Sequence, residues 1–86
     1  MESTSESLIQ RLKDPEDSIA WRRFAGSYIP VIQTWLYSLG IDGHAAEDIT
    51  QEIVIRVSNE MQKGFQYNPD LKFRAWLFTM SRRLAL

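Results

Sequence analysis

The segment between Asp42 and Gly64 has a helical repeat that strongly limits what this chain can fold into. In its run HAAEDITQEIVIRVSNEM, small and apolar residues recur every three or four positions, at the spacing of one side of an α-helix. Asp42 is placed to cap the first turn, and Gly64 can end the helix in a left-handed conformation. We therefore predict an amphipathic helix packed on a core through Ala46, Ile49, Thr50, Ile53, Val57 and Met61.

The opposite side of this helix is polar but has an isoleucine at its centre. Ile55 shares that side with Asp48, Gln51, Glu52 and Asn59, all at helical spacing. Burial within one small domain does not explain an isoleucine among carboxylates and amides. We interpret this side as a surface that a partner covers, although its carboxylates without Ile55 would suggest an ordinary solvated face.

A long helix is predicted before this segment. Asp14 can accept from the free amides of a first turn, and Pro15 loses nothing at the first helical position. Because the apolar spacing continues past Pro30, we expect the proline to kink this helix rather than end it, and Gly40 to stop it. The apolar residues at helical spacing are Ile19, Phe24, Tyr28, Ile32, Trp35, Leu36 and Leu39.

The run FRAWLFTMSRRLAL at the end of the chain predicts a last helix. Its predicted inner side carries Phe73, Trp76, Leu77, Met80 and Leu84, and its outer side carries Arg74, Phe78, Ser81, Arg82 and Ala85. The helical pattern has no stop signal at residue 86, so we expect the natural protein to continue.

These elements predict an all-α fold. Ser5 or Ser7 can cap a short N-terminal helix that contributes Leu8, Ile9 and Leu12, and no strand pattern or repeat occurs in the sequence. We predict a small bundle of three longer helices, one kinked at proline, plus the short helix. Residues 1–14 would form a tail and the short helix, and residues 15–86 the helical domain.

Composition sets the class of protein. With 86 residues and 44% hydrophobic content, the chain can build one domain with a modest core, and without cysteine it has no disulfide or thiolate metal site. The N-terminus is acidic where a signal peptide is basic, and no apolar run is long enough to cross a bilayer. We expect a soluble cytoplasmic protein with no membrane partner.

Charge is unevenly distributed along the chain. Residues 1–60 carry ten acidic and five basic side chains, whereas residues 61–86 carry one acidic and five basic ones. A basic segment with aromatic residues suits a polyanion, and an acidic surface suits a basic or polar protein. Both surfaces could also be merely solvated.

The sequence lacks the usual elements of an enzyme. His44 is its single histidine, and His44 with Asp48 one turn later supplies only two metal ligands. It has no glycine-rich phosphate loop and no cysteine nucleophile, and carboxylates on an exposed helix side lack the burial that separates pKa values. We predict no catalysis, no cofactor and no metal.

Two motifs together carry a family resemblance. The run AEDITQEI, residues 46–53, followed after a loop by FRAWLFTMSRRLAL, resembles region two of bacterial RNA polymerase sigma factors of the extracytoplasmic-function (ECF) group. The resemblance covers roughly residues 15–86, and the pair is more specific than either motif alone. It implies a domain that binds core RNA polymerase and recognises and helps open the promoter minus-ten element.

The resemblance also implies roles for individual residues. The acidic helix would bind the clamp coiled coil of the largest polymerase subunit through Asp48, Gln51, Glu52, Ile55 and Asn59. The loop would read a base flipped out of the single-stranded non-template strand through Phe65, Gln66, Tyr67, Asn68 and Lys72, and the last helix would line that strand with Arg74, Trp76, Arg82 and Arg83. An anti-sigma factor that masks these surfaces is a further implied partner, and a helix-turn-helix domain would lie in the continuation of the chain.

The sequence departs from the family at two positions. The family often has Arg-Asn where this chain has Arg82-Arg83, and a small capping residue where it has Lys72. The base contact of that asparagine and the base preference of the loop are therefore not carried over, and Arg83 can hold a phosphate or read a guanine edge.

Alternative interpretations of these residues stay open. Trp76 faces the predicted core and can serve mainly packing, Phe65 and Tyr67 can simply tuck the loop onto the bundle, and Arg82 and Arg83 can be solvated. The alternative function is a helical protein-interaction adaptor that uses the acidic side alone and does not bind DNA.

Overall fold

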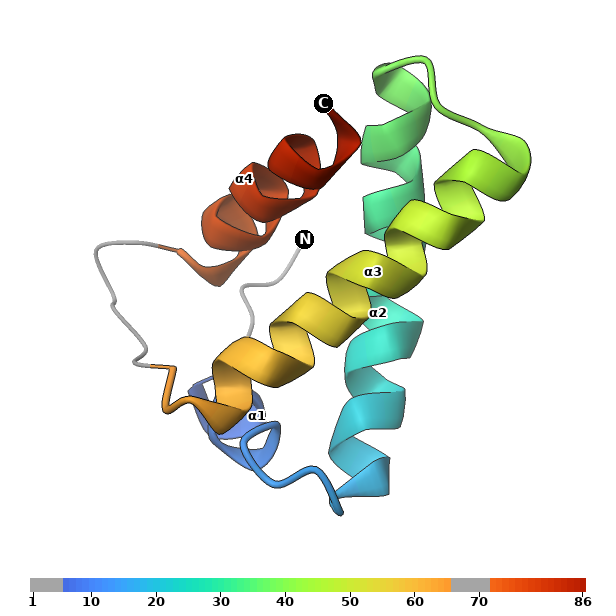
Figure 1. Cartoon of the computed structure of the whole chain (residues 1–86). Coiled ribbons are helices and arrows are strands. Elements are labelled where there is room, and N and C mark those ends of the chain that lie inside the picture. The colour runs from blue at the N-terminus through green and yellow to red at the C-terminus, as the bar shows by residue number, and fades with distance from the viewer. Residues whose placement is uncertain (1–5, 66–71) are drawn as a thin grey trace.

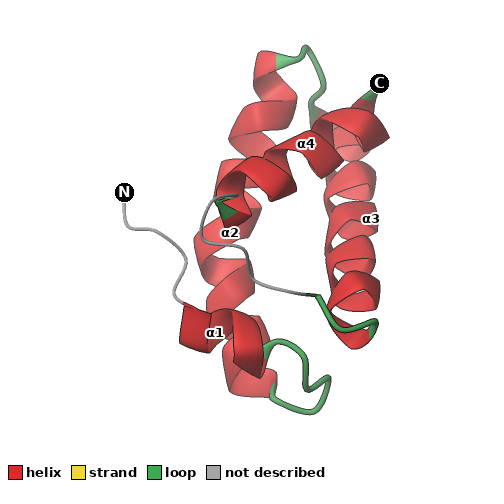
Figure 2. Ribbon diagram, turned by 90° about the vertical axis from the view of Figure 1, so that its left-hand side faces the viewer, coloured by secondary structure: helices red, strands yellow, loops and turns green. Residues whose placement is uncertain are grey.

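The computed structural model describes residues 6–65 and 72–86, and within them every regular element is a helix (Figure 1). The elements are α1 Glu6–Arg11, α2 Ser18–Ser38, α3 Gly43–Gln62 and α4 Phe73–Ala85. Helix α4 packs on both α2 and α3, α2 also packs on α3, and α1 packs on α2 (Figure 2). This confirms the predicted all-α bundle of one short and three longer helices.

The core lies where α2, α3 and α4 meet, and two fully buried side chains close it, Ile9 of α1 and Leu12 of the turn that follows α1. Burying each such aliphatic side chain stabilises the fold by about 1.5–3 kcal/mol. The predicted core side of α3 is confirmed, with Ile49 only partly buried. The buried residues of the two long helices are Ala20, Phe24, Tyr28, Ile32 and Leu36 in α2, and Ala46, Thr50, Ile53, Val57 and Met61 in α3.

Two apolar residues of the helical repeat predicted for this segment lie outside the core. Ile19 is 62% exposed and Leu39 is 37% exposed. The buried residues follow a four-residue spacing centred on Tyr28, and Ile19 lies nine positions away, on the opposite side of the helix. Leu39 is the C-cap residue, beyond the last helical turn that packs inward.

The inner side of α4 is turned relative to the prediction. Ser81, predicted on the outer side, is 1% exposed, while Trp76, Met80 and Leu84 are only partly buried. Phe73 and Leu77 are buried as predicted, so the core row runs from these residues to Ser81. Burial of the serine is tolerated because its hydroxyl donates to the Leu77 carbonyl at 2.8 Å.

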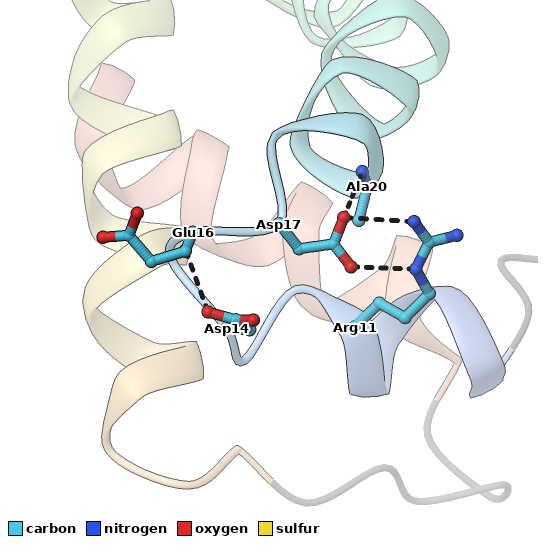
Figure 3. A network of polar contacts seen from close by, with 5 residues as sticks. All are labelled: Arg11, Asp14, Glu16, Asp17 and Ala20. Atoms are coloured by element: carbon cyan, nitrogen blue, oxygen red, sulfur yellow. Dashed lines mark hydrogen bonds and ion pairs between the residues drawn. The ribbon is translucent and has the colours of Figure 1, made fainter.

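Helix α2 begins three residues later than predicted, with Asp17 instead of Asp14 as its N-cap. The Asp17 carboxylate accepts from the Ala20 amide at 3.1 Å and from the Arg11 guanidinium at 2.9 and 3.0 Å (Figure 3). Asp14 instead accepts from the Glu16 amide at 2.9 Å. Asp17 accepts from a helix amide and from the Arg11 guanidinium together, and both interactions stabilise it as the cap.

The predicted helix ends are confirmed at both glycines. Gly40 has φ +83° and Gly64 has φ +90°, and the amide after each glycine donates back to a helix carbonyl. Those bonds are 2.9 Å from Ile41 to Leu36 and 3.2 Å from Phe65 to Glu60, which is the Schellman arrangement.

Two other predictions about helix geometry had different outcomes. Asp42 precedes α3 as expected, but its side chain makes no capping hydrogen bond. Helix α2 continues through Pro30, while a kink there stays a prediction. In the described residues, no helix combines the length and apolar character needed to cross a membrane.

The ion pair at the start of α2 predicts acid sensitivity. The Arg11 hydrogen bonds, followed by the Ala20 amide, lower the pKa of the Asp17 carboxyl below 3.8. A lowered pKa in the folded state gives stability that is present above the unfolded value and is lost as the pH falls through the folded value. We expect Asp17→Asn to lower the urea midpoint at pH 7 and to lose this difference from the parent chain below pH 3.8.

Asp14→Asn is the matched control, because Asp14 receives one backbone amide and no guanidinium among the described residues. Its urea midpoint should stay close to that of the parent chain across the same pH range. A difference for Asp17→Asn that does not change with pH would contradict the assigned role of the ion pair.

The glycine in the middle of α2 predicts a stabilising substitution. Gly26 is exposed, has no positive φ, and a Cβ added there meets no atom within 4 Å. Because glycine is less favourable than alanine inside a helix, Gly26→Ala should raise the free energy of unfolding by about 0.5–1 kcal/mol. Urea denaturation measures this change. Gly40→Ala should lower the free energy of unfolding, because Gly40 has a φ of +83°. A lower free energy of unfolding for Gly26→Ala would contradict the prediction.

Candidate functional site

The polar side of α3 is fully available to a partner. All five of its predicted members are exposed, and Ile55, at the centre, is 57% exposed. We call this surface the acidic face, and it consists of Asp48, Gln51, Glu52, Ile55 and Asn59. Its exposure agrees with the sequence interpretation, while the partner that it binds stays a prediction.

An aromatic cluster fixes the start of α4 against the rest of the bundle. The Phe73 ring lies 5.6 Å from Tyr28 and 5.4 Å from Trp76, centroid to centroid. Phe65, just after α3, lies 4.7 Å from Trp76. Phe65 and Trp76 are each only partly buried, so both pack on the core and still present ring surface outward.

A hollow of about 270 Å³ lies between α3 and α4, beside this aromatic cluster. Its wall combines two guanidinium groups, one carboxylate, an indole and two apolar side chains. On α3 the lining residues lie between the core side and the acidic face, because Arg56 follows Ile55 directly and Glu60 comes one turn later. The lining residues are Arg56, Glu60, Trp76, Thr79, Met80, Arg83 and Leu84.

The basic residues predicted for this region do not all face the hollow. Arg83 lines it together with Trp76, while Arg82 is exposed elsewhere on α4 and Lys72 is exposed at the N-cap position. Three predicted residues, Gln66, Tyr67 and Asn68, lie outside the described part of the chain.

Arg74 lies toward α2. Burial raises the pKa of the Tyr28 hydroxyl, and the charge of Arg74 opposes that shift. Within the described residues, the Arg74 Nε is buried without a hydrogen-bond partner. Because its Nε is buried, Arg74 is less available to a strand than the sequence suggests.

Sequence reasoning missed Arg56 and Glu60 as members of this site. They occur one turn apart on α3, a spacing shared by many solvated pairs, and only the packing of α4 brings them beside Trp76. The described residues contain no group of three histidine, cysteine, aspartate or glutamate side chains that could hold a metal ion. The His44 Nδ1 lies 3.5 Å from the Glu47 Oε2.

Comparison with known families places these surfaces in context. Residues 24–86 match the family described as sigma-70 region 2. The comparisons with curated proteins and with solved structures gave no match. Because the family match covers well over half of the chain, including the acidic face and the hollow, the chain belongs to the sigma-70 region 2 family.

Proposed function

We propose that this domain belongs to a sigma factor of the ECF group, that its acidic face binds core RNA polymerase, and that the hollow side of α4 binds promoter DNA. Sigma-70 region 2 is a transcription initiation domain involved in core polymerase binding and promoter melting, and it is not a family of enzymes. The exposure of Ile55 in the middle of the acidic face is the observation that carries the residue-level proposal.

The acidic face has the chemistry to bind an arginine-bearing coiled coil. Asp48 and Glu52 can each accept charge-assisted hydrogen bonds from guanidinium groups, the strong and often bidentate kind. Ile55 supplies the apolar centre from which a bound partner excludes water, as in the most energetic parts of protein interfaces. We propose the clamp coiled coil of the largest polymerase subunit as this partner.

The hollow has the chemistry to hold an unpaired base and its backbone. Stacking on a ring such as Trp76 contributes about 1–3 kcal/mol per base, comparable to the few kcal/mol that extruding a base costs. Arg56 and Arg83 offer charge to phosphates, and Glu60 can accept from an exocyclic base amine. The non-template strand of the opened minus-ten element is the proposed occupant.

The remaining features of the proposal concern location and regulation. We place the protein in the cytoplasm with the polymerase, and we propose an anti-sigma factor as a protein that masks the acidic face. The proposed readers of the flipped base, three of which lie outside the described residues, are Phe65, Gln66, Tyr67, Asn68 and Lys72.

Ile55→Ala tests the polymerase surface. Removing the apolar centre of an interface costs 2 kcal/mol or more at energetic hot spots, so affinity for core polymerase should fall by about 30-fold. Fluorescence anisotropy of the labelled domain, titrated with core polymerase at nanomolar concentration, measures it. Ile19→Ala is the matched control, since Ile19 is similarly exposed but lies on α2. Equal affinities of both variants would refute this role of Ile55.

Arg83→Ala tests the DNA surface. If Arg83 holds a phosphate of the single strand, its loss should weaken binding of a forked minus-ten oligonucleotide by the polymerase complex and reduce the salt slope by about 0.7. Arg23→Ala removes an exposed arginine of α2 and should change neither quantity. An unchanged slope with an altered base preference would assign Arg83 to a base edge instead. If Arg83 and Trp76 variants both bind polymerase normally and neither variant changes DNA binding, the alternative function as a protein-interaction adaptor is favoured.

A further inference from the structure

The outer side of α2 carries an exposed apolar residue that neither the core nor the proposed function uses. Ile19 is 62% exposed on the side of α2 opposite Tyr28. Arg22, Arg23 and Gly26 follow it at three, four and seven positions; the two arginines are exposed, and Gly26 leaves open space around its Cα. We call Ile19, Arg22, Arg23 and Gly26 the basic face.

The charges of the basic face are unbalanced. Residues 18–38 contain two arginines and no carboxylate, and within the described part of the chain neither arginine has an acidic group at ion-pair distance. A Cβ added at Gly26 would meet only open space, so this glycine costs helix stability without filling any internal need. This side of α2 therefore has two arginines without an ion-pair partner among the described residues, an exposed isoleucine and a glycine. Such a surface suits an acidic helix, because the charges attract and the glycine allows the helices to approach closely.

The acidic face of α3 has the same pattern in reverse order. Three and four positions before Ile55 stand Glu52 and Gln51, and seven positions before it stands Asp48. At about 1.5 Å rise per residue, the outermost residue of each face lies about 10.5 Å along the helix from its isoleucine. In an antiparallel arrangement the two isoleucines meet, the arginines of the basic face lie opposite Glu52, and Gly26 lies opposite Asp48.

We infer that the basic face of one copy docks antiparallel on the acidic face of a second copy of this chain. The charges are complementary, the apolar centres coincide, and Gly26 lets the two helix backbones approach. The two faces differ, so the contact is heterologous and leaves a free face of each kind for further copies. One helix side buries less than the roughly 800 Å² per partner of a standard stable interface, so the association is weak and reversible.

Self-docking would regulate access to polymerase, a consequence that rests on the proposed function. The second copy covers Ile55, Glu52 and Asp48, the residues proposed to meet the clamp coiled coil. Polymerase would therefore compete with a second copy for the same face, and the contact would become significant only when the protein is concentrated.

Sedimentation equilibrium tests the docking from about 10 μM to about 1 mM, the range in which weak interfaces dissociate. The weight-average mass of the parent chain should rise with concentration at low salt. Two charge-reversal variants, Arg22→Glu/Arg23→Glu and Asp48→Lys/Glu52→Lys, should each associate at least about tenfold more weakly. The quadruple variant that combines them keeps the net charge of −1 and should regain association, because the charges are complementary again.

Two further variants sharpen the result. Gly26→Leu should weaken association, because the leucine side chain occupies the space between the two helix backbones. Its helix content, measured by circular dichroism, should stay that of the parent chain. Gly26→Ala adds a single methyl group and should weaken association less. A parent chain that stays monomeric throughout, or association that neither charge reversal weakens, would overturn the inference. Association that the quadruple variant fails to regain would also overturn it.

Polymerase binding at nanomolar concentration separates this inference from the proposed function. Arg22→Glu/Arg23→Glu should bind core polymerase like the parent chain, whereas Asp48→Lys/Glu52→Lys should not. A monomeric parent chain that shows this polymerase pattern would refute self-docking alone. Normal polymerase binding by Asp48→Lys/Glu52→Lys would refute the proposed polymerase face, whatever the sedimentation shows.

Discussion

The arrangement of the whole domain depends on one aromatic ring at the first position of α4. Phe73 is 3% exposed, and its ring contacts Phe24 and Tyr28 of α2, Phe65 after α3, and Trp76 of α4. Aromatic pairs add about 0.5–1.5 kcal/mol each beyond the burial of their area. Because these contacts join the three longer helices, the position of Trp76, and with it one wall of the hollow, follows from the core.

Helix α3 shows how one periodic sequence can serve a core and a surface at once. The 3.6-residue repeat places Ile53 and Val57 inward and Ile55 outward, so the same apolar residue type has opposite roles two positions apart. Between these sides lie Arg56 and Glu60, which reach the hollow. A single rigid helix therefore carries the proposed polymerase face and part of the proposed DNA surface.

The features that depend on one helix alone could be predicted from the sequence. Both sides of α3 and the ends at Gly40 and Gly64 belong to this group, because each follows from spacing or from local backbone conformation. Features decided by a second element could not be predicted. The cap at Asp17 also binds Arg11 of α1, and Ser81 is buried because α4 packs on α2 and α3.

The same reasoning explains the errors at the site. Arg56 and Glu60 line the hollow only because α4 packs beside them, and Arg74 lies close enough to Tyr28 of α2 for its charge to oppose the shift in the pKa of the hydroxyl. Ile19 belongs to the apolar repeat by residue type, but the buried residues of α2, spaced four apart, lie on the opposite side of the helix. The exposure of Ile19 depends on which side of α2 packs against the other helices. It therefore identifies an apolar residue that the core does not use.

Sharing one helix between two surfaces has an energetic consequence for promoter opening. If the hollow binds a base as proposed, stacking there would roughly offset the cost of extruding that base, so the domain alone would gain little from capturing a strand. Polymerase bound to the acidic face would lie one helix side away from the hollow, and its own contacts to the strand would add to that balance. Because α3 is one continuous helix that carries both proposed surfaces, polymerase bound to the acidic face would position the hollow on the DNA, and the free energy of docking would then contribute to holding the strands apart.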